Sequence, residues 1–203
     1  METIQSNSKK LDFGAYSVGK NVYFRYPTKA DAVGKWHHWL NSPDVTRFLA
    51  SQNWPISPED QLNYLKNTRK SKQRLLLSII DRASSNHIGV GSLGSIDYIN
   101  RRAEVSLIIG EAEYRDGIRA LECLSMLTEI GLVKLNLNKL VVTSLSISLA
   151  GLKIDSAIGY RECGRWHEHA FINGNYVDCV LMELFQRDWL ESPMRPKSSY
   201  MIG

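Results

Sequence analysis

The sequence predicts an α/β domain built on one mixed β-sheet. Runs rich in β-branched residues, with alternating polarity, recur along the chain and are typical of strands. Between them lie runs whose apolar residues recur at helical spacing. The order is a strand, helices, three strands, a helix, a strand, a helix and two strands, which indicates helices packed on a sheet. A length of 203 residues with 43% hydrophobic content suits one domain with short extensions.

The N-terminal part contains one strand and a group of helices. Residues 1–20 are polar and contain glycine, so we expect a flexible leader there. The run NVYFRY at 21–26 is the first strand. The helices that follow are indicated by Thr28 with Asp31 as a capping box, by SPDVTRFL at 42–49, and by Ser57-Pro58-Glu59-Asp60 as a start signal.

The second part supplies most of the sheet. Its expected elements are strands at 74–81, 87–99 and 102–109, a helix at about 117–134, a strand at 138–146, a helix at 149–158, and strands at 160–171 and 175–185. Ile172-Asn173-Gly174 joins the last two strands as a hairpin turn. We therefore expect the domain to cover 21–190 and a C-terminal tail to cover 191–203.

The composition indicates the cellular compartment and the classes of partner that we expect for the protein. No run approaches the roughly 20 apolar residues of a membrane span, and METIQSNSKK at the N-terminus lacks the apolar core of a signal peptide. The three cysteines, Cys123, Cys163 and Cys179, lack metal-type spacing, which favours reduced thiols in a cytoplasm. A net charge of +4 is low for a nucleic-acid-binding domain but favours an anionic ligand. We expect a cytoplasmic protein without membrane or nucleic-acid partners.

Two motifs suggest specific sites that their context does not support. Gly89 to Gly94 match the dinucleotide fingerprint G-x-G-x-x-G, but that fingerprint must open a helix and a strand continues here. His167 and His169 share one face of a predicted strand, yet no third ligand lies at a suitable spacing. We therefore predict neither a dinucleotide site nor a metal site.

A run of cations closes the helix that starts at Ser57. Its members are Lys66, Arg69, Lys70, Lys72 and Arg74. One interpretation is a solvated helix end, because cations there complement the helix dipole. The other is a rim that attracts an anion beside the ligand site.

The stretch EAEYRDGIRALEC at 111–123 joins an apolar strand to an apolar helix through a short charged turn. A helix N-terminus offers unpaired N–H groups and about half a positive charge, so such a turn can hold a phosphate. A plain connection between strand and helix is the alternative interpretation.

From residue 21 to about 189 the chain resembles the GNAT superfamily of acetyl-CoA-dependent N-acetyltransferases, in particular the branch with ribosomal-protein alanine and amino-sugar acetyltransferases. The resemblance is carried by WHHWLNSPDVTRFL (36–49), HIGVGSLGSID (87–97), AEVSLIIGEAEYRDGIRALE (103–122), LNLNKLVV (135–142) and AIGYRECGRWHEHAFINGNYVDCVLMEL (157–184). It implies a mostly antiparallel sheet in which two central strands splay apart. The pantetheine of acetyl-CoA, the co-substrate, would enter that gap.

The resemblance further implies that the turn after the fourth strand binds the CoA pyrophosphate. Arg115 and Ala120 fit the ends of the family pattern Arg/Gln-x-x-Gly-x-Gly/Ala, whereas Ile118 occupies the place of the middle glycine. Because isoleucine tolerates a positive φ poorly, we expect the turn to bend at Gly117 or to bind more loosely. Phosphate contacts of Arg115 and Arg119 would compensate. The expected cofactor-binding residues are Ile108, Ile109, Arg115, Asp116, Gly117, Ile118, Arg119, Ala120 and Ser148.

Two positions depart from the family near the pantetheine and the thiol. Ser148 stands where the family often has asparagine, and Asp155 stands where it often has the tyrosine that protonates the leaving thiolate. At an ordinary pKa near 3.9, Asp155 is ionised at pH 7 and has no proton to give. Its helix gives no sign of burial. We therefore expect solvent or the ammonium proton to reach the thiolate, or Asp155 to orient a cationic acceptor.

Acetyl transfer to an amine needs a base, and donors for the developing oxyanion. Glu104 is the candidate base, since its position is often acidic in this branch and it shares a strand face with Ile108. An ion pair of Glu104 with Arg101 or Arg102 is the structural alternative. Backbone N–H groups around Ile108 and Ile109 would hold the oxyanion.

The acceptor would be selected by the helical region at 36–49, including Trp39, and by the final hairpin, including His167 and His169. The resemblance implies direct transfer from acetyl-CoA to a small-molecule primary amine, such as an amino sugar or its nucleotide conjugate. A protein N-terminus as acceptor, and a non-catalytic acyl-CoA-binding module, are the alternatives. The sequence is compatible with a homodimer.

Overall fold

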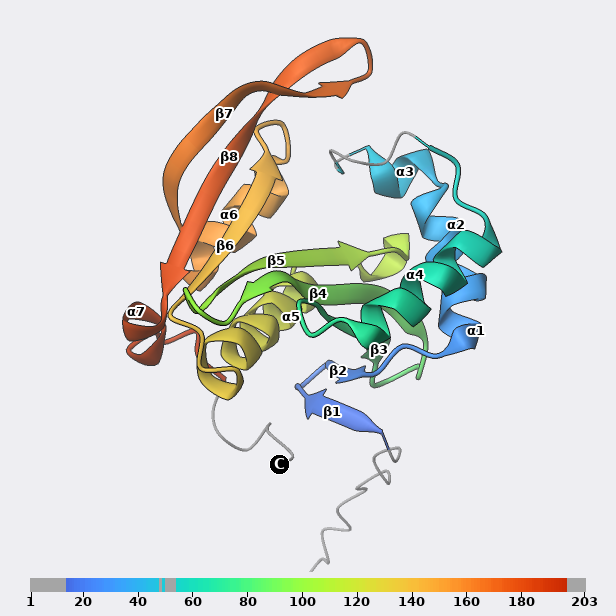
Figure 1. Cartoon of the computed structure of the whole chain (residues 1–203), viewed down its shortest axis with the longest axis horizontal. Coiled ribbons are helices and arrows are strands. Elements are labelled where there is room, and N and C mark those ends of the chain that lie inside the picture. Colours follow the sequence, from blue (N-terminus) through green and yellow to red (C-terminus); the bar gives the residue numbers. More distant parts are fainter. Residues whose placement is uncertain (1–13, 48, 50–53, 197–203) are drawn as a thin grey trace, which may run out of the picture.

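The computed structural model describes residues 14–47, 49 and 54–196, and it confirms the predicted α/β fold (Figure 1). A single eight-stranded sheet runs through the molecule in the order β1-β2-β3-β4-β5-β6-β8-β7. Neighbouring strands pair antiparallel except β5 and β6, which pair parallel. The sheet is therefore mixed and mostly antiparallel, as expected.

Every element predicted from the sequence is present, and β1 and α7 are additional. The strands are β1 (Ala15–Val18), β2 (Val22–Arg25), β3 (Leu75–Asp81), β4 (His87–Asp97), β5 (Arg102–Ile109), β6 (Lys139–Leu145), β7 (Arg161–Ile172) and β8 (Asn175–Phe185). The helices are α1 (Lys29–Asp31), α2 (His37–Leu40), α3 (Pro43–Thr46), α4 (Pro58–Lys70), α5 (Ile118–Glu129), α6 (Leu149–Ile158) and α7 (Gln186–Leu190). Wide helical turns at Ala32–Trp36 and Ile130–Lys134 join α1 to α2 and extend α5.

The described part of the expected leader is ordered into the sheet. Residues 15–18 form β1 and pair antiparallel with β2, and Val18 is buried. Glu122 of α5 holds the following turn by accepting hydrogen bonds from the backbone and side chain of Asn21. The expectation of a flexible leader is therefore wrong for these residues, because β1 buries apolar surface against the core. Residues 1–13 lie outside the described part.

Helices cover both faces of the sheet and create two cores. α5 and α6 pack on one face, over the largest group of buried side chains, which includes Val105 of β5 and Leu140 of β6. The segment around α1 and α2, together with α4, covers the other face at β3 and β4, where Trp36, Trp39 and Leu76 are buried. Along β5, odd-numbered side chains therefore point toward α5 and even-numbered ones toward the opposite face.

The glycines at 89–94 serve the sheet and not a dinucleotide. All of them lie within β4, so no helix starts at this motif. A Cβ on Gly89 would lie 2.3 Å from the carbonyl oxygen of Ile108, and one on Gly91 would lie 2.9 Å from a methyl group of Leu127. These glycines therefore allow the neighbouring strand and helix to pack closely against β4.

The contact between β5 and β6 is short, and this opens the sheet. It pairs Arg102 with Lys139, Ala103 with Leu140 and Glu104 with Val141, and it ends there. β5 continues to Ile109 and β6 to Leu145, so the strands diverge over the rest of their length (Figure 1). The central splay implied by the resemblance is present. In the part of the chain that the structure describes, no helix is long and apolar enough to cross a membrane.

Candidate active site

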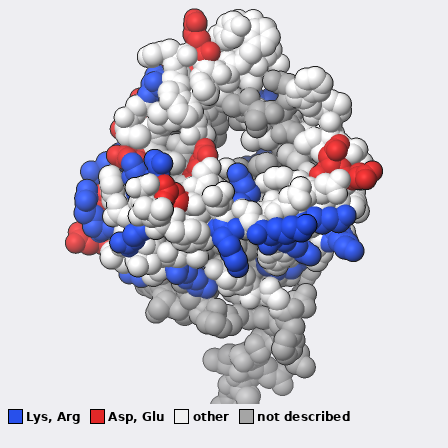
Figure 2. Space-filling model, in the orientation of Figure 1, with Lys and Arg blue, Asp and Glu red and all other residues white. Residues whose placement is uncertain are grey.

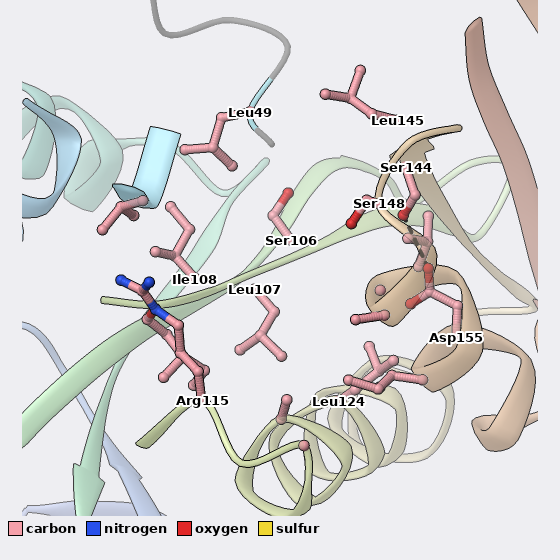
Figure 3. Close-up of a pocket in the computed structure, with 18 of the residues that line it drawn as sticks. Leu49, Ser106, Leu107, Ile108, Arg115, Leu124, Ser144, Leu145, Ser148 and Asp155 are labelled. Carbon is pink, nitrogen blue, oxygen red and sulfur yellow. Dashed lines mark hydrogen bonds between the residues drawn. The ribbon is translucent and has the colours of Figure 1, made fainter. Parts of the chain in front are cut away.

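A cavity of about 580 Å³ lies where β5 and β6 diverge (Figure 3). Its walls come from the diverging strands, the turn before α5, the helices α5 and α6, and the α3 region. The lining residues are 44, 45, 47, 49, 105–109, 115–117, 120, 124, 142–145, 148, 150, 151, 154 and 155. Arg115 and Ile108 lie on one side of this space, and Ser144 and Asp155 lie on the other (Figure 3).

The splay exposes backbone donors of β5 to the cavity. The N–H of Gly110 donates to the carbonyl of Ile88 in β4, at 2.8 Å. Because N–H direction alternates along a strand, the N–H of Ile108 also points toward β4, whereas those of Leu107 and Ile109 point toward the gap. Of the two donors expected from the sequence, Ile109 fits the position and Ile108 does not; Leu107 takes its place.

The turn before α5 bends at Gly117. Gly117 has φ 77° and ψ −34°, precedes the first residue of α5, and has open space where a Cβ would lie. Ile118 follows as the first helical residue, with 65% of its side chain exposed. Of the two expected alternatives, a bend at Gly117 or looser binding, the bend at Gly117 is present. Glycine adopts the positive φ one residue before the family's position, so Ile118 does not have to adopt it.

Arg115 and Arg119 are both bound to the protein itself. Arg115 donates from Nε to the carbonyl of Ile109 at 3.0 Å and from Nη2 to that of Gly110 at 2.7 Å. Arg119 pairs with the buried carboxylate of Asp81, at 3.0 Å from Nε, and also with Asp116. Direct phosphate contacts from either guanidinium would have to compete with these bonds. Arg115 instead fixes the end of β5, and Arg119 fixes the start of α5.

The cofactor-binding residues expected from the sequence divide into two groups. Those that line the cavity are Ile108, Ile109, Arg115, Asp116, Gly117, Ala120 and Ser148. Ile118 and Arg119 lie outside the lining. Asp116 accepts a hydrogen bond from the N–H of Arg119 at 3.0 Å, so its carboxylate already caps this helix end.

Asp155 is buried, contrary to the expectation from its sequence context. Only 5% of the residue is exposed, and Ser144 Oγ donates to its Oδ2 at 3.0 Å. Burial raises the pKa of Asp155 to about 6, and the hydrogen bond from Ser144 lowers that pKa only in part. The neighbouring Lys153 is exposed and makes no ion pair with it, because α6 turns the two side chains in different directions. The cavity therefore contains a carboxyl group that exchanges its proton near neutral pH.

Glu104 lies at the point where the strands begin to diverge. It is the last β5 residue that pairs with β6, and its side chain is half-buried on the same face as that of Ser106, which lines the cavity. The structural alternative is not supported: Arg101 binds Asn136, and Arg102 pairs with Asp97. Among the described residues Glu104 has no ion pair and no side-chain hydrogen bond. This carboxylate is available to a ligand.

The three expected acceptor-binding residues do not line the cavity. Trp39 is buried, and its Nε1 donates to Glu111 at 3.2 Å while its ring covers Gly110. It belongs to the core because Gly110 leaves room for the indole. His167 and His169 are exposed on the projecting β7–β8 hairpin (Figure 1).

The two histidines also fail to act as a pair. The register of β7 shifts between Trp166 and Ala170, and Glu168 has φ 50°. His167 Nδ1 lies 3.2 Å from Asp178, whereas the His169 ring contacts that of Trp166. The bulge interrupts the alternation that the prediction assumed. No group of three ligating side chains that could hold a metal occurs within the described ranges.

Sequence reasoning missed several lining residues. Ser144 and Val142 alternate along β6 onto the face that packs against α5, and Ile154 and Leu124 come from the helices on that face. The alternation of β6 was a usable signal for Ser144. Asp44 and Arg47 belong to the helical region at 36–49 that was expected to select the acceptor, and this region does contribute to the lining. No pattern singled out these two residues, because their place depends on how α3 folds back over the end of β5.

Strand N–H groups directed at a gap beside a helix N-terminus are suited to an oxyanion and to an anionic carrier of an acyl group. The family described as "Acetyltransferase (GNAT) domain" matches residues 21–160. The chain belongs to this family and is an N-acetyltransferase.

Two curated proteins and one solved structure place the chain among its relatives. It is 27% identical to the spermidine N(1)-acetyltransferase of Vibrio cholerae over 154 residues, 76% of this chain and 87% of that protein. It is also 27% identical to the Bacillus subtilis protein YdaF, provisionally named a ribosomal N-acetyltransferase, over 101 residues. That match spans 50% of this chain and about half, 55%, of YdaF.

The solved structure is that of a Vibrio cholerae spermidine N-acetyltransferase in complex with CoA and spermine. It has a TM-score of 0.79 and 21% identity, and the alignment covers 85% of this chain and all of the other. At this identity the likeness concerns the fold. The fold class predicted from the sequence is thereby confirmed.

Proposed function

We propose that the protein transfers the acetyl group of acetyl-CoA to a primary amine of a small molecule, within the cavity between β5 and β6. The divergence of these strands after Glu104 and Val141 carries the proposal. It leaves strand N–H groups directed at a space that also reaches the N-terminus of α5. A thioester carbonyl requires such donors, and a diphosphate requires such a helix end.

The residues present fit a CoA diphosphate at the turn before α5. The open space at Gly117 allows a ligand to approach the backbone, and Ile118 points its side chain away into solvent. The carboxylate of Asp116 opposes an anion at this position, and Arg119 offsets part of that charge. Acetyl-CoA supplies the activated acyl group, and the chain supplies the positioning.

Glu104 would act as the base on the acceptor. Its carboxylate lies on the β5 face that it shares with Ser106, just outside the cavity lining, and has no partner among the described residues. It would accept a proton from the ammonium directly or through water. The amine nitrogen then bonds to the acyl carbon, and the N–H groups of Leu107 and Ile109 stabilise the oxyanion. Both donors lie on the strand that bears Glu104, so base and oxyanion site are held by one element.

Asp155 would return a proton to the sulfur as the C–S bond breaks. With a pKa of about 6, it is about 10% protonated at pH 7, and exclusion of water by a bound ligand would favour the protonated form further. The ammonium loses two protons in all. One passes through Glu104 to water. The other replaces the proton that Asp155 has given to the thiolate.

The acceptor is the open part of the proposal. The family resemblance implied an amino sugar or its nucleotide conjugate, whereas the names of the Vibrio cholerae relatives point to spermidine and spermine. A protein N-terminus is the runner-up, suggested by the name of YdaF. All three classes present a primary amine, so one assay can compare them.

The test is release of free thiol from acetyl-CoA with a panel of amines. The panel contains glucosamine, glucosamine 6-phosphate, spermidine, spermine and short peptides with free N-termini, with buffer alone as the control for hydrolysis. We expect turnover with at least one small amine and mass-spectrometric evidence of an N-acetyl product. Turnover with peptides alone would refute a small-molecule acceptor.

A further inference from the structure

Arg74 lies beside the candidate base and is separated from the other cations of its run. It directly precedes β3, and its guanidinium lies on Gly94 of β4: a Cβ built on Gly94 would be 2.8 Å from Cζ and both Nη atoms. Nη1 also lies 3.3 Å from the Oγ of Ser92. The side chain is therefore folded flat across the sheet and does not extend into solvent.

Gly94, which has no side chain, lies between Arg74 and Glu104. Gly94 is paired with Glu104 of β5, and Leu75 with Leu93 of β4, so residues 74, 94 and 104 form one row across three strands. Side chains in such a row point to the same face. Adjacent strands are about 4.8 Å apart, so the guanidinium lies roughly one strand spacing from the backbone of the candidate base.

Arg74 has no anionic partner among the described residues. Its hydrogen bond goes to the neutral hydroxyl of Ser92, and no carboxylate, including that of Glu104, forms an ion pair with it. By contrast, Arg69 donates to the carbonyl of Pro27 and stacks on Tyr26. The run of cations therefore does not act as one group, and Arg74 is the member that faces the sheet.

The surface around this row is hollowed and basic. Figure 2 shows a hollow between the β7–β8 hairpin and the α3 region, with Lys and Arg side chains gathered below it over α4 and the neighbouring strands. Lys66, Lys70 and Lys72 are exposed near the end of α4. Such a surface attracts anions and repels a polycation.

We infer that Arg74 binds an anionic group of the acceptor, and that the acceptor class is a small amine bearing a phosphate or a carboxylate. This inference rests on the proposed function. The amine would face Glu104, and the anion would face Arg74 over Gly94, one to two strand spacings away, about 5–10 Å. A guanidinium suits both anions because it presents paired donors in one plane. Polyamines carry no such group.

The test compares matched acceptors that differ in the anion alone. Glucosamine 6-phosphate is paired with glucosamine, and 4-aminobutyrate with 4-aminobutyramide, so that the two pairs distinguish phosphate from carboxylate. In the wild-type protein we expect at least a tenfold higher kcat/KM for the charged member of one pair, and a poorer value for spermidine. Arg74→Gln should reduce kcat/KM for that charged member about 10- to 100-fold.

Three controls isolate the anion contact. The neutral member of the pair and the KM for acetyl-CoA should change less than threefold in Arg74→Gln. Arg187→Gln removes the same charge from an exposed side chain on α7 and should leave the ratio within each pair unchanged. Arg74→Lys keeps the charge without the planar group and should give an intermediate ratio.

Two outcomes would overturn the inference. One is a wild-type protein that prefers spermidine or the neutral member of both pairs. The other is an Arg74→Gln variant that loses activity equally on charged and neutral acceptors, which indicates a structural role. Absence of turnover with every amine counts instead against the proposed function.

A binding measurement tests, without turnover, whether Arg74 binds an anion. With CoA present at saturation, inorganic phosphate should raise the melting temperature of the wild-type protein and of Arg187→Gln, but not that of Arg74→Gln. An equal shift in all three proteins would show that the anion binds elsewhere, and the assignment of Arg74 would fail.

Discussion

Glu104 and Asp155 lie on opposite faces of the sheet, and the gap between β5 and β6 connects the two faces. Glu104 points to the face that α1, α2 and α4 partly cover, and Asp155 belongs to α6 on the other face. The same division would let an amine approach from one side and a thiol leave from the other. Proton removal and proton return are therefore assigned to different carboxyl groups in different surroundings.

Glu104→Gln should separate base catalysis from binding. The amide keeps the shape of the side chain but cannot take up a proton, so we expect kcat to fall about 100-fold while acetyl-CoA binding stays unchanged. Glu183→Gln is the matched control, because Glu183 lies in the same cross-strand row and pairs with Lys139. Steady-state kinetics from pH 6 to 9 provide the measurement. Full activity of the variant over that range would make Glu104 structural.

Asp155→Asn should lower activity and raise stability at the same pH. The folded-state pKa of Asp155, about 6, lies above its ordinary value of 3.8, so the folded state binds the proton more tightly than the unfolded state. The stability that this group contributes is complete below about pH 4 and is lost as the pH rises to 6. The loss is about 3 kcal/mol at neutral pH.

The asparagine variant avoids that loss because its side chain stays neutral. We expect a higher free energy of unfolding than wild type at pH 7.5 and little difference at pH 4. Turnover should slow by about tenfold or more, because the amide has no proton to give to the sulfur. Denaturant titrations at the two pH values and thiol-release kinetics measure this. Asp188→Asn on α7 is the control for an exposed carboxylate. An unchanged turnover rate would remove Asp155 from the mechanism.

The burial of Asp155 could not be predicted from the sequence. LAGLKIDSAI contains apolar residues on more than one side, so the pattern alone does not tell which turn of the helix faces the sheet. Ile158, three residues later, is fully buried and lies on the same helix face. Arg74 was recognised only as a cation in a run, because its contact with Gly94 depends on the pairing of β3 with β4.

At the scale of elements, the clearest prediction concerns the turn before α5. Gly117→Ala forces a side chain into φ 77°, which should cost about 1–2 kcal/mol, although the space around it is open. We expect a fall in melting temperature of a few degrees and a several-fold rise in the KM for acetyl-CoA. Gly164→Ala is the matched control, since its φ is ordinary and a Cβ would meet only Leu181, at 3.6 Å. An unchanged KM would place the diphosphate elsewhere.

Most elements were predictable because their patterns are local. The capping box at Thr28, the helix start at Ser57 and the turn at Asn173-Gly174 were confirmed. β1 was missed because four residues beside a polar segment give too little pattern, and its stability comes from pairing with β2. The bulge in β7 also lacked a signal, since Glu168 adopts a positive φ without glycine.

At the scale of the whole molecule, the sheet consists of two parts joined by a short ladder. Three residue pairs link β5 to β6, whereas β6 and β8 share seven. α5 and α6 pack together across this junction and hold the two parts from one face. A ligand that enters the gap contacts both strands and adds a connection that the sheet lacks. The stability of the whole fold should therefore report on occupancy of the gap.

Acetyl-CoA should raise the melting temperature of the protein in a concentration-dependent way. Binding to the folded state alone stabilises it by RT ln(1 + [L]/Kd), about 2.7 kcal/mol at 100 times Kd, or roughly 5–10 °C for a chain of this size. NAD and ATP should produce much smaller shifts, because they lack the pantetheine that would fill the splay. Amide exchange should slow at Leu107 and Ile109, whose N–H groups face the gap, and stay unchanged at Val90 and Ile108, which pair within the β4–β5 ladder. Equal protection by NAD, or protection that omits Leu107 and Ile109, would mean that the nucleotide binds outside the gap between β5 and β6.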